Sequence, residues 1–415
     1  MSEGSVTLGI DVGTSSVKVV AVDDSGTQIA SAERPHALMT PRPGWTEQQP
    51  EDWWQGACEA LAEIRDRLAG ASPEAIGLSG QMHGMVPLDA HDAVIRPAIL
   101  WNDQRTGEAA REIDRVVGRE RLLERGGNPA ITGFQLAKVV WLRSAEPERF
   151  ARLTHAAAAA SGLPDGLPVV AGAGDNAAAA TGMGLSSAEP ELGSVSLGTS
   201  GVLFAPIARA TPDPQGRVHL FCHADGGYYL LGVTLAAAGS LQWAHDALFE
   251  DVGFDELTRL AEASPPGAGG VTFQPYLSGE RTPYMDPALR GAWRGLTLAT
   301  QRADLVRSVL EGVAFSQRDS LEVMRPLANL ERVLATGGGS RSRFWLQLLA
   351  DALELPITQL RDAPGAAYGA ALLAHRALGR TVAPDLAPLA RLDPAPDEAL
   401  REAYARYRAW SPAPL

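Results

Sequence analysis

A short glycine-rich segment occurs twice in this chain, at residues 9–16 and again at residues 196–201, and each copy joins two apolar, β-branched runs. Runs of this kind separated by Gly, Thr and Ser predict β-hairpins. At such a turn, glycine lets the backbone approach a phosphate, while free N–H groups and hydroxyls donate to its oxygens. We therefore predict two phosphate-binding turns, Gly13-Thr14-Ser15 and Gly198-Thr199-Ser200.

The first copy also carries an acidic residue, Asp11. A carboxylate beside a polyphosphate would repel it unless a divalent cation lies between the two, so we predict that Asp11 handles Mg²⁺, directly or through water. A turn aspartate is the alternative. One isolated Gly-Thr-Ser turn more often closes an ordinary hairpin. The presence of two copies favours a nucleotide gripped by two domains.

Other phosphate-binding folds are excluded by the residues present. The chain contains no Gly-x-x-x-x-Gly-Lys-Ser/Thr segment, and Lys18 and Lys138 are its only lysines, so it is not a P-loop protein. Its 415 residues are 45% hydrophobic and 20% charged, which is typical of a globular protein of two or three domains.

The formal net charge of −13 argues against binding to negatively charged macromolecules and membranes. Nucleic acids and anionic membranes offer no counter-charge to an acidic surface, so we expect neither as a partner. The first residues lack the basic and apolar regions of a signal peptide, and no apolar stretch reaches membrane-spanning length. A cytoplasmic location is the default expectation.

Polar clusters follow several predicted strands, where open α/β sheets place ligand-binding groups. Met82 and His83 follow the strand over residues 75–80, and Asp175 and Asn176 follow the strand that begins near residue 167. Asp175 can be a general base at the floor of a cleft, the N-cap of the alanine-rich helix after it, or both. A third cluster follows the run at residues 98–100: Trp101, Asn102 and Asp103.

The second half repeats the order of the first, since strands around the second turn are followed by helices and by the glycine turn Gly337-Gly338-Gly339. The simplest interpretation is an α/β fold with two duplicated domains, residues 1–185 and 186–415, that flank a cleft.

These segments, taken together, resemble the FGGY carbohydrate kinases of the actin-like, ribonuclease-H-like superfamily. The resemblance covers nearly the whole chain, and the segments at residues 80–84 and 278–283 favour the xylulokinases within that family. It implies ATP-dependent phosphorylation of D-xylulose to D-xylulose 5-phosphate, with Mg²⁺, and makes a homodimer plausible.

The resemblance also implies roles for the residues. Asp175 is the catalytic base and Asp11 the catalytic metal-handling residue. The sugar site comprises Met82, His83, Trp101, Asn102, Asp103, Asp175 and Asn176; the nucleotide site comprises Gly13, Thr14, Ser15, Gly198, Thr199, Ser200, Gly337, Gly338, Gly339 and Arg341.

The chain departs from the family pattern after His155. Family members carry a long further piece of the first domain there, whereas this chain has five alanines, residues 156–160, and Ser161. Either the first domain is shortened, or the sequence omits a stretch. A catalytically impaired nucleotide-binding protein therefore stays open. An FGGY kinase for another ketose or polyol also stays open, because sugar specificity depends on a few contacts that motif spacing does not resolve.

Overall fold

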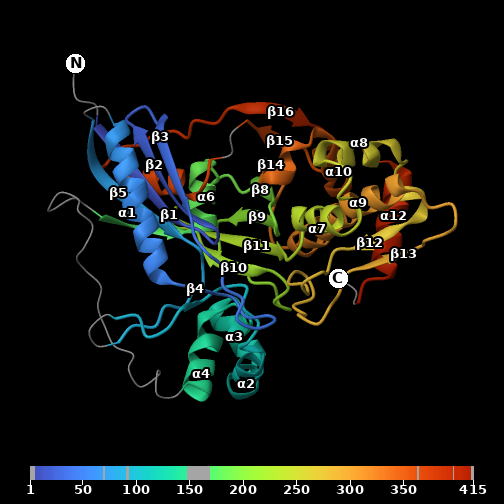
Figure 1. Ribbon diagram of the computed structural model, residues 1–415, viewed down its shortest axis with the longest axis horizontal. Helices are drawn as coiled ribbons and strands as arrows, with labels where there is room; N and C mark the ends of the chain where they lie inside the picture. The colour runs from blue at the N-terminus through green and yellow to red at the C-terminus, as the bar shows by residue number, and fades with distance from the viewer. Residues whose placement is uncertain are drawn as a thin grey trace. The chain divides into compact units, whose positions relative to one another are not determined.

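The computed structural model describes residues 5–68, 71–89, 93–146, 169–361, 364–395 and 397–412 (Figure 1). It contains two compact units. Unit 1 consists of Met1–Gly184 and Pro364–Asp385, and unit 2 of Leu185–Ala363 and Leu386–Leu415. The first boundary lies within one residue of the expected cut at 185/186. The return of residues 364–385 to unit 1 was not expected, and the alanine run at 156–160 lies outside the described residues.

Unit 1 is built on a five-stranded mixed sheet with the order β3-β2-β1-β5-β7. Strands β1, β2 and β3 are antiparallel neighbours, while β5 runs parallel to β1 and β7 runs parallel to β5. The expected hairpin around residues 13–15 is the β1–β2 connection. The strands span Ser5–Val12 (β1), Ser16–Asp23 (β2), Gln28–Pro35 (β3), Ser72–Gly80 (β5) and Val169–Gly174 (β7), and a separate pair joins Glu47–Gln48 (β4) to Ala98–Ile99 (β6).

The central strands of unit 1 are buried on both faces because helices cover each side. Along β2, Val17 and Val19 belong to the cluster that packs against α1, whereas Val20 and Val22 pack against α11. This alternation follows the two-residue period of a strand. The helices are Pro50–Arg67 (α1), Gly107–Val117 (α2), Arg119–Gly126 (α3), Gln135–Ala145 (α4), Asp175–Gly182 (α6) and Ala366–Ala377 (α11).

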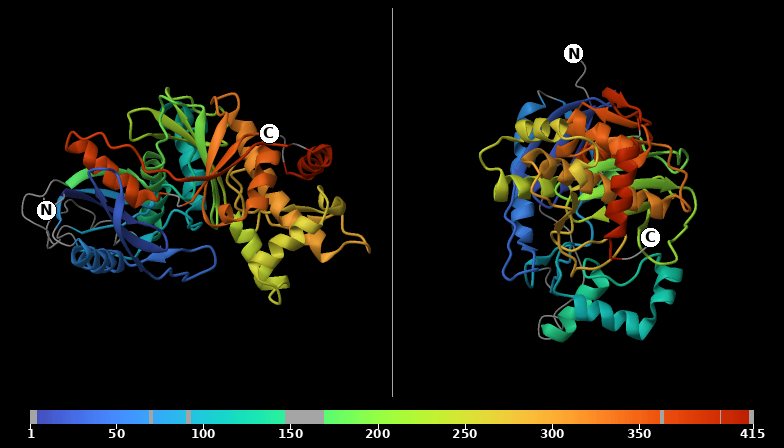
Figure 2. Two further views of the ribbon diagram at one scale, coloured as in Figure 1. Left: turned by 90° about the horizontal axis from the view of Figure 1, so that it is seen from above. Right: turned by 90° about the vertical axis from the view of Figure 1, so that its right-hand side faces the viewer.

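Helix α11 reaches unit 1 from near the end of the chain, and in the left view of Figure 2 this orange-red helix lies beside the blue strands. Its backbone touches the sheet directly. A Cβ atom on Gly9 would lie 1.7 Å from the Ala367 carbonyl oxygen, and one on Gly77 would lie 1.7 Å from that of Ala370. Only glycine allows this approach, so Gly9 serves helix packing rather than a phosphate.

Unit 2 repeats the sheet of unit 1 and adds a strand at each edge, giving the order β10-β11-β9-β8-β14-β15-β16. Its inner five strands have the same order and directions as the unit 1 sheet, three antiparallel and then two parallel. The strands span Leu192–Leu197 (β8), Gly201–Ile207 (β9), His219–Cys222 (β10), Tyr228–Thr234 (β11), Arg332–Thr336 (β14), Ile357–Leu360 (β15) and Pro388–Leu392 (β16). This repetition confirms the expected duplicated, actin-like α/β fold.

The core of unit 2 lies around helix α9, Arg302–Met324, most of whose residues are buried. A capping box between Gln301 and Asp304 fixes where this helix begins. The other elements are Ala238–Leu248 (α7), Phe254–Ala263 (α8), Arg343–Leu353 (α10), Glu398–Ala409 (α12), the short pair Thr272–Gln274 (β12) and Ala292–Arg294 (β13), and the 3₁₀ turns Ala268–Gly270 (η1) and Gly338–Arg341 (η2). Within the described ranges, no helix is both long and apolar enough to cross a membrane.

Candidate functional site

The first glycine-rich turn leaves backbone donors available. The Gly13 N–H donates to the Ser16 carbonyl at 2.9 Å, which closes the turn. In the described part of the chain, the N–H groups of Thr14 and Ser15 donate to no acceptor. The Thr14 hydroxyl, however, donates to Gln81 Oε1 at 3.2 Å. Thr14 can therefore offer a phosphate its N–H rather than the hydroxyl that the sequence suggested.

Asp11 lies at the end of β1, just before this turn. Its Oδ1 atom is shielded from solvent and has no hydrogen-bond partner among the described residues. Burial raises the pKa of Asp11, and the nearby Ser79 hydroxyl and Lys18 lower it by smaller amounts. A buried carboxylate oxygen without a partner is what a hard cation such as Mg²⁺ requires. No cluster of three or more His, Cys, Asp or Glu occurs in the described ranges, so phosphate and water would complete the coordination.

Asp175 opens helix α6 directly after β7. Gly174 is the N-cap residue, so the alternative that Asp175 itself caps the helix does not hold. Its Oδ1 accepts hydrogen bonds from the backbone N–H (2.8 Å) and the side-chain amide (3.0 Å) of Asn176, while Oδ2 accepts none from the described residues. Burial raises the pKa of Asp175 to about 6, the Asn176 bonds oppose this rise, and the charge of Asp11 adds to it. Oδ2 is thus available to take a proton.

Met82 lies against the residues on either side of Asp175, and His83, the next residue, is held by Lys138 and Phe134. The Asn176 amide lies 3.8 Å from Met82 Sδ, and a Cβ atom on Gly174 would lie 2.8 Å from Met82 Cγ. His83 has a positive φ of 62°, which is uncommon for a residue other than glycine. The buried Lys138 Nζ donates to the His83 carbonyl at 2.5 Å, and the Phe134 ring lies 4.3 Å from the His83 ring.

Lys138 is a residue whose importance the sequence reasoning missed, because no local pattern around it indicates a contact with His83. Its complete burial and its bond to His83 give it a positioning role. Its presence as one of two lysines in 415 residues was the available signal.

The cluster at residues 101–103 divides into two environments. The Trp101 indole N–H donates to Thr14 Oγ1 at 3.0 Å, and Asn102 Oδ1 accepts from the Thr46 hydroxyl at 2.7 Å. Asp103 is fully buried, and both of its oxygens are used by the Arg105 guanidinium, with one also accepting the Thr46 N–H. The expectation that Asp103 contacts the sugar is therefore wrong, because no carboxylate oxygen is left to reach a ligand.

In unit 2, the second turn lies against the start of helix α7. The N–H groups of Ala237 and Ala238 donate to the carbonyls of Thr199 and Gly198, both at 2.8 Å. The hydroxyls of Thr199 and Ser200 make no hydrogen bond to the described residues, so both remain available to a ligand.

The glycine turn after β14 lies against the same region. Gly337 has a φ of 85°, and a Cβ there would lie 2.6 Å from the Leu197 carbonyl carbon. Gly339 is buried against Leu197 in a similar way. Gly338 is the member of the turn that faces open space, because no atom would lie within 4 Å of a Cβ there. Arg341, at the end of η2, is exposed and does not line the neighbouring cavity.

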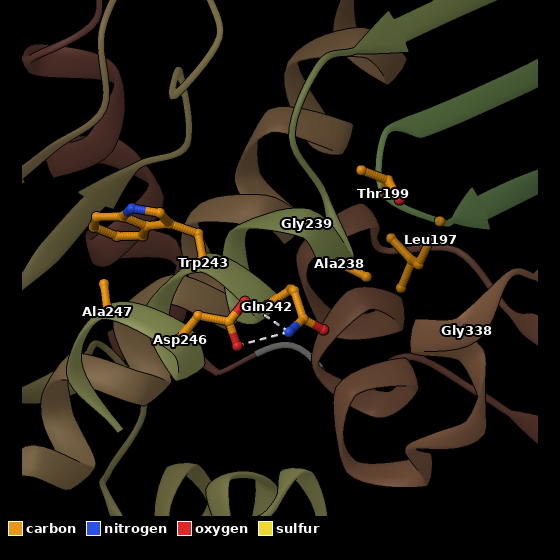
Figure 3. Close-up of a pocket in the computed structure, with 10 residues that line it drawn as sticks. Leu197, Thr199, Ala238, Gly239, Gln242, Trp243, Asp246, Ala247 and Gly338 are labelled. Atoms are coloured by element: carbon orange, nitrogen blue, oxygen red, sulfur yellow. Dashed lines mark hydrogen bonds between the residues drawn. The ribbon is translucent and has the colours of Figure 1, made fainter. Parts of the chain in front are cut away.

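A cavity of about 710 Å³ opens between these turns and helix α7, as Figure 3 shows. Helix α7 contributes Gln242, Trp243 and Asp246 to it, and the Gln242 amide donates to both Asp246 oxygens at 2.8 and 2.9 Å. Sequence reasoning missed these side chains, since nothing in the helix pattern indicates which face meets a turn at residue 338. The lining residues are Leu197, Gly198, Thr199, Ala238, Gly239, Gln242, Trp243, Asp246, Ala247 and Gly338.

Comparison with known proteins gives consistent matches. The models of the FGGY family of carbohydrate kinases match residues 6–156 with the N-terminal domain and residues 193–378 with the C-terminal domain. A xylulose kinase of Staphylococcus epidermidis is 34% identical over 443 residues, covering 90% of this chain and 88% of the relative. The xylulose kinase of Bacillus subtilis is 33% identical, covering 88% and 87%.

A solved structure described as a xyloylose kinase from Brucella ovis is 34% identical, has a TM-score of 0.85, and covers 97% of this chain and 98% of its own. The alignment with the Staphylococcus relative extends over 443 positions, more than the 415 residues of this chain, so it includes positions that have no counterpart here. A shortened first domain and an omitted stretch would both give such an alignment, so both alternatives stay open.

Proposed function

This chain belongs to the FGGY family of carbohydrate kinases, and we propose that it transfers the γ-phosphoryl group of ATP to the terminal hydroxyl of D-xylulose, giving D-xylulose 5-phosphate and ADP. The observation that carries the proposal is the Asp175 carboxylate, which has one oxygen unused by the described residues and bonds to the same Asn176 amide that contacts Met82 Sδ. The similarity to relatives named xylulose kinase supports the choice of sugar.

In this proposal, Asp175 accepts the proton of the attacking hydroxyl. A new bond forms between the sugar oxygen and the γ-phosphorus, the bond to the β-phosphate oxygen breaks, and ADP leaves. The pKa of about 6 suits a general base near neutral pH, because most molecules then carry an ionised carboxylate that still has appreciable proton affinity. Asp11 would hold Mg²⁺, which neutralises charge on the phosphates when bound. Met82, His83 and Asn176 would orient the sugar.

The cavity in unit 2 is our candidate for the adenosine half of ATP. Its volume of about 710 Å³ lies within the range of ligand pockets, roughly 300–1,000 Å³. Trp243 and the Gln242–Asp246 pair provide an aromatic face and polar groups on one wall. Since ATP and sugars are cytoplasmic metabolites, we also propose a cytoplasmic location.

Filling this cavity is expected to weaken ATP binding without unfolding the protein. A leucine at Gly338 meets no atom within 4 Å of its Cβ, so the Gly338→Leu side chain should enter the cavity. We expect the Kd for ATP, measured by calorimetry, to rise by about tenfold or more, since the lost contacts amount to at least about 1.4 kcal/mol. Gly253→Leu, at another exposed and open glycine of unit 2, is the matched control and should leave the Kd unchanged. Equal Kd values for ATP in both variants would contradict the proposal that this cavity binds the adenosine half of ATP.

The function itself is tested by coupled measurement of ADP production with and without D-xylulose, followed by a panel of other ketoses and polyols. We expect sugar-dependent ADP release that is fastest with D-xylulose. Faster ADP release with another sugar would support the kinase activity but replace D-xylulose as the proposed substrate. If the protein binds ATP but releases no ADP with any sugar, the result would instead support a catalytically impaired nucleotide-binding protein.

A further inference from the structure

Two glutamine side chains connect the first phosphate turn to the segment that carries Met82 and His83. Gln81 directly precedes Met82, and Gln48 lies at the end of β4 and is almost completely buried. The Gln81 amide donates to the Gly13 carbonyl at 3.3 Å and to Gln48 Oε1 at 2.9 Å, while its oxygen accepts from the Thr14 hydroxyl. Gln81 therefore contacts both backbone and side chain of the turn.

The orientation of the Gln81 amide is fixed by its partners. Its two N–H bonds go to the Gly13 carbonyl and to Gln48 Oε1. Turning the amide over would place its oxygen against these two acceptor oxygens. A polar network in which every donor and acceptor has a hydrogen-bond partner rigidifies the groups that it joins.

Gln48 supports the same turn at the neighbouring residue, Thr14. Its amide donates to the Thr14 carbonyl at 2.7 Å and lies 3.0 Å from His36 Nδ1, while its oxygen also accepts from the Trp53 indole at 3.1 Å. The backbone of the turn is thus held at Gly13 and Thr14 through two amides that bond to each other. The Thr14 and Ser15 N–H groups, which we assign to phosphate, lie within this held segment.

We propose that Gln81 is a positioning residue that couples sugar binding to nucleotide-phosphate binding. The inference rests on the proposed kinase function. A sugar that orders Met82 and His83 also restrains Gln81, one residue away, and Gln81 then holds the turn in the conformation that presents its N–H groups. By thermodynamic reciprocity, phosphate bound at the turn must favour sugar binding by the same factor.

The test is the effect of sugar on nucleotide affinity in Gln81→Met, which keeps the side-chain length and removes all three bonds. The Kd of a non-hydrolysable ATP analogue with Mg²⁺ is measured by calorimetry with and without saturating D-xylulose. For the wild-type protein we expect the sugar to tighten binding by a factor within the usual range of about 5–150. For Gln81→Met we expect a factor of about 2 or less, while the Kd for D-xylulose alone changes by less than about 3-fold.

Gln55→Met is the matched control, because this exposed glutamine on α1 bonds only to Glu59 among the described residues. It should retain the wild-type factor. Gln81→Glu is a second variant in case Gln81→Met does not fold: it keeps the acceptor for the Thr14 hydroxyl but loses both donated bonds, and it should also lose the coupling. Melting temperatures report whether each variant is folded.

The outcomes separate the inference from the function on which it rests. Wild-type protein that produces no ADP with any sugar contradicts the proposed function. Wild-type protein that is active but shows no effect of sugar on nucleotide affinity overturns the coupling alone. A folded Gln81 variant that binds both ligands more weakly but keeps the wild-type factor also overturns it, because Gln81 would then be merely structural.

Discussion

Replacing Asp175 with asparagine is expected to lower kcat for sugar phosphorylation by about 10²- to 10⁴-fold, the usual contribution of a general base. Asparagine keeps the size of the side chain and an oxygen that can accept the Asn176 N–H, so the start of α6 should be preserved. Because the sugar would still bind to Met82, His83 and Asn176, we expect KM for D-xylulose to change much less than kcat. The coupled assay of ADP production measures both.

The pH dependence of the wild-type enzyme tests the same assignment. With a pKa of about 6, Asp175 is ionised above pH 6 and protonated below it. We expect kcat/KM to be level above this value and to fall by about tenfold per pH unit well below it. A level profile from pH 5 to 8 would contradict the assignment of Asp175 as the base.

Asp175→Asn should also stabilise the protein at high pH. The folded-state pKa, about 6, lies above the ordinary value of 3.8, so the folded protein binds this proton more tightly than the unfolded chain. The contribution of Asp175 to the free energy of unfolding is therefore greatest below pH 3.8. It falls by up to about 3 kcal/mol as the pH rises to 6 and above. The variant should melt at a higher temperature than wild type at pH 8 but not at pH 4. Asp66→Asn, on the exposed surface of α1, is the control and should change neither activity nor melting.

Replacing Asp11 with asparagine is expected to lower kcat by about 10²- to 10³-fold, as removal of a group that stabilises transition-state charge does. An amide oxygen binds Mg²⁺ more weakly than a carboxylate, so the Mg²⁺ concentration giving half-maximal rate should rise. Titrating Mg²⁺ at fixed ATP and D-xylulose measures this shift. An unchanged rate at all Mg²⁺ concentrations would return Asp11 to the alternative of an ordinary turn residue.

A second measurement on Asp11→Asn separates a metal-binding role from general damage to the fold. Burial raises the pKa of Asp11, so its ionised form destabilises the folded protein at neutral pH when no cation is present. We expect the variant to melt at a higher temperature than wild type in EDTA, and we expect added Mg²⁺ with ATP to stabilise wild type more than the variant. A lower melting temperature in EDTA would indicate a damaged fold.

Much of the fold could be predicted from the sequence because its strongest signals are local. The strands on each side of Gly13-Thr14-Ser15 and of Gly198-Thr199-Ser200 follow from β-branched runs and turn residues, and both turns lie where the sequence predicts them. Asp11 was selected because it lies beside the first glycine-rich turn, and Asp175 because it follows an apolar strand. Their roles remain proposals.

The side-chain partners of these residues could not be predicted. Arg105 is only two residues from Asp103 in the sequence, and its guanidinium donates to both Asp103 oxygens. Because Asp103 is also buried, this pairing prevents it from reaching a ligand, and burial is not visible in the local sequence. Lys138 reaches His83 across 55 residues, and Gln81 reaches Gly13 across 68. Contacts over such separations depend on how helices and strands pack, which no local pattern records.

The sequence by itself determined two copies of one sheet pattern, each with a glycine-rich turn, because strand periodicity and turn chemistry act between neighbouring residues. Only the tertiary structure decided that helix α11 completes unit 1, that Gly9 serves packing, and that helix α7 lines the cavity. The physical reason is that these outcomes depend on the close approach of segments far apart in the chain. Whether a Cβ or a side chain fits there is settled only after folding.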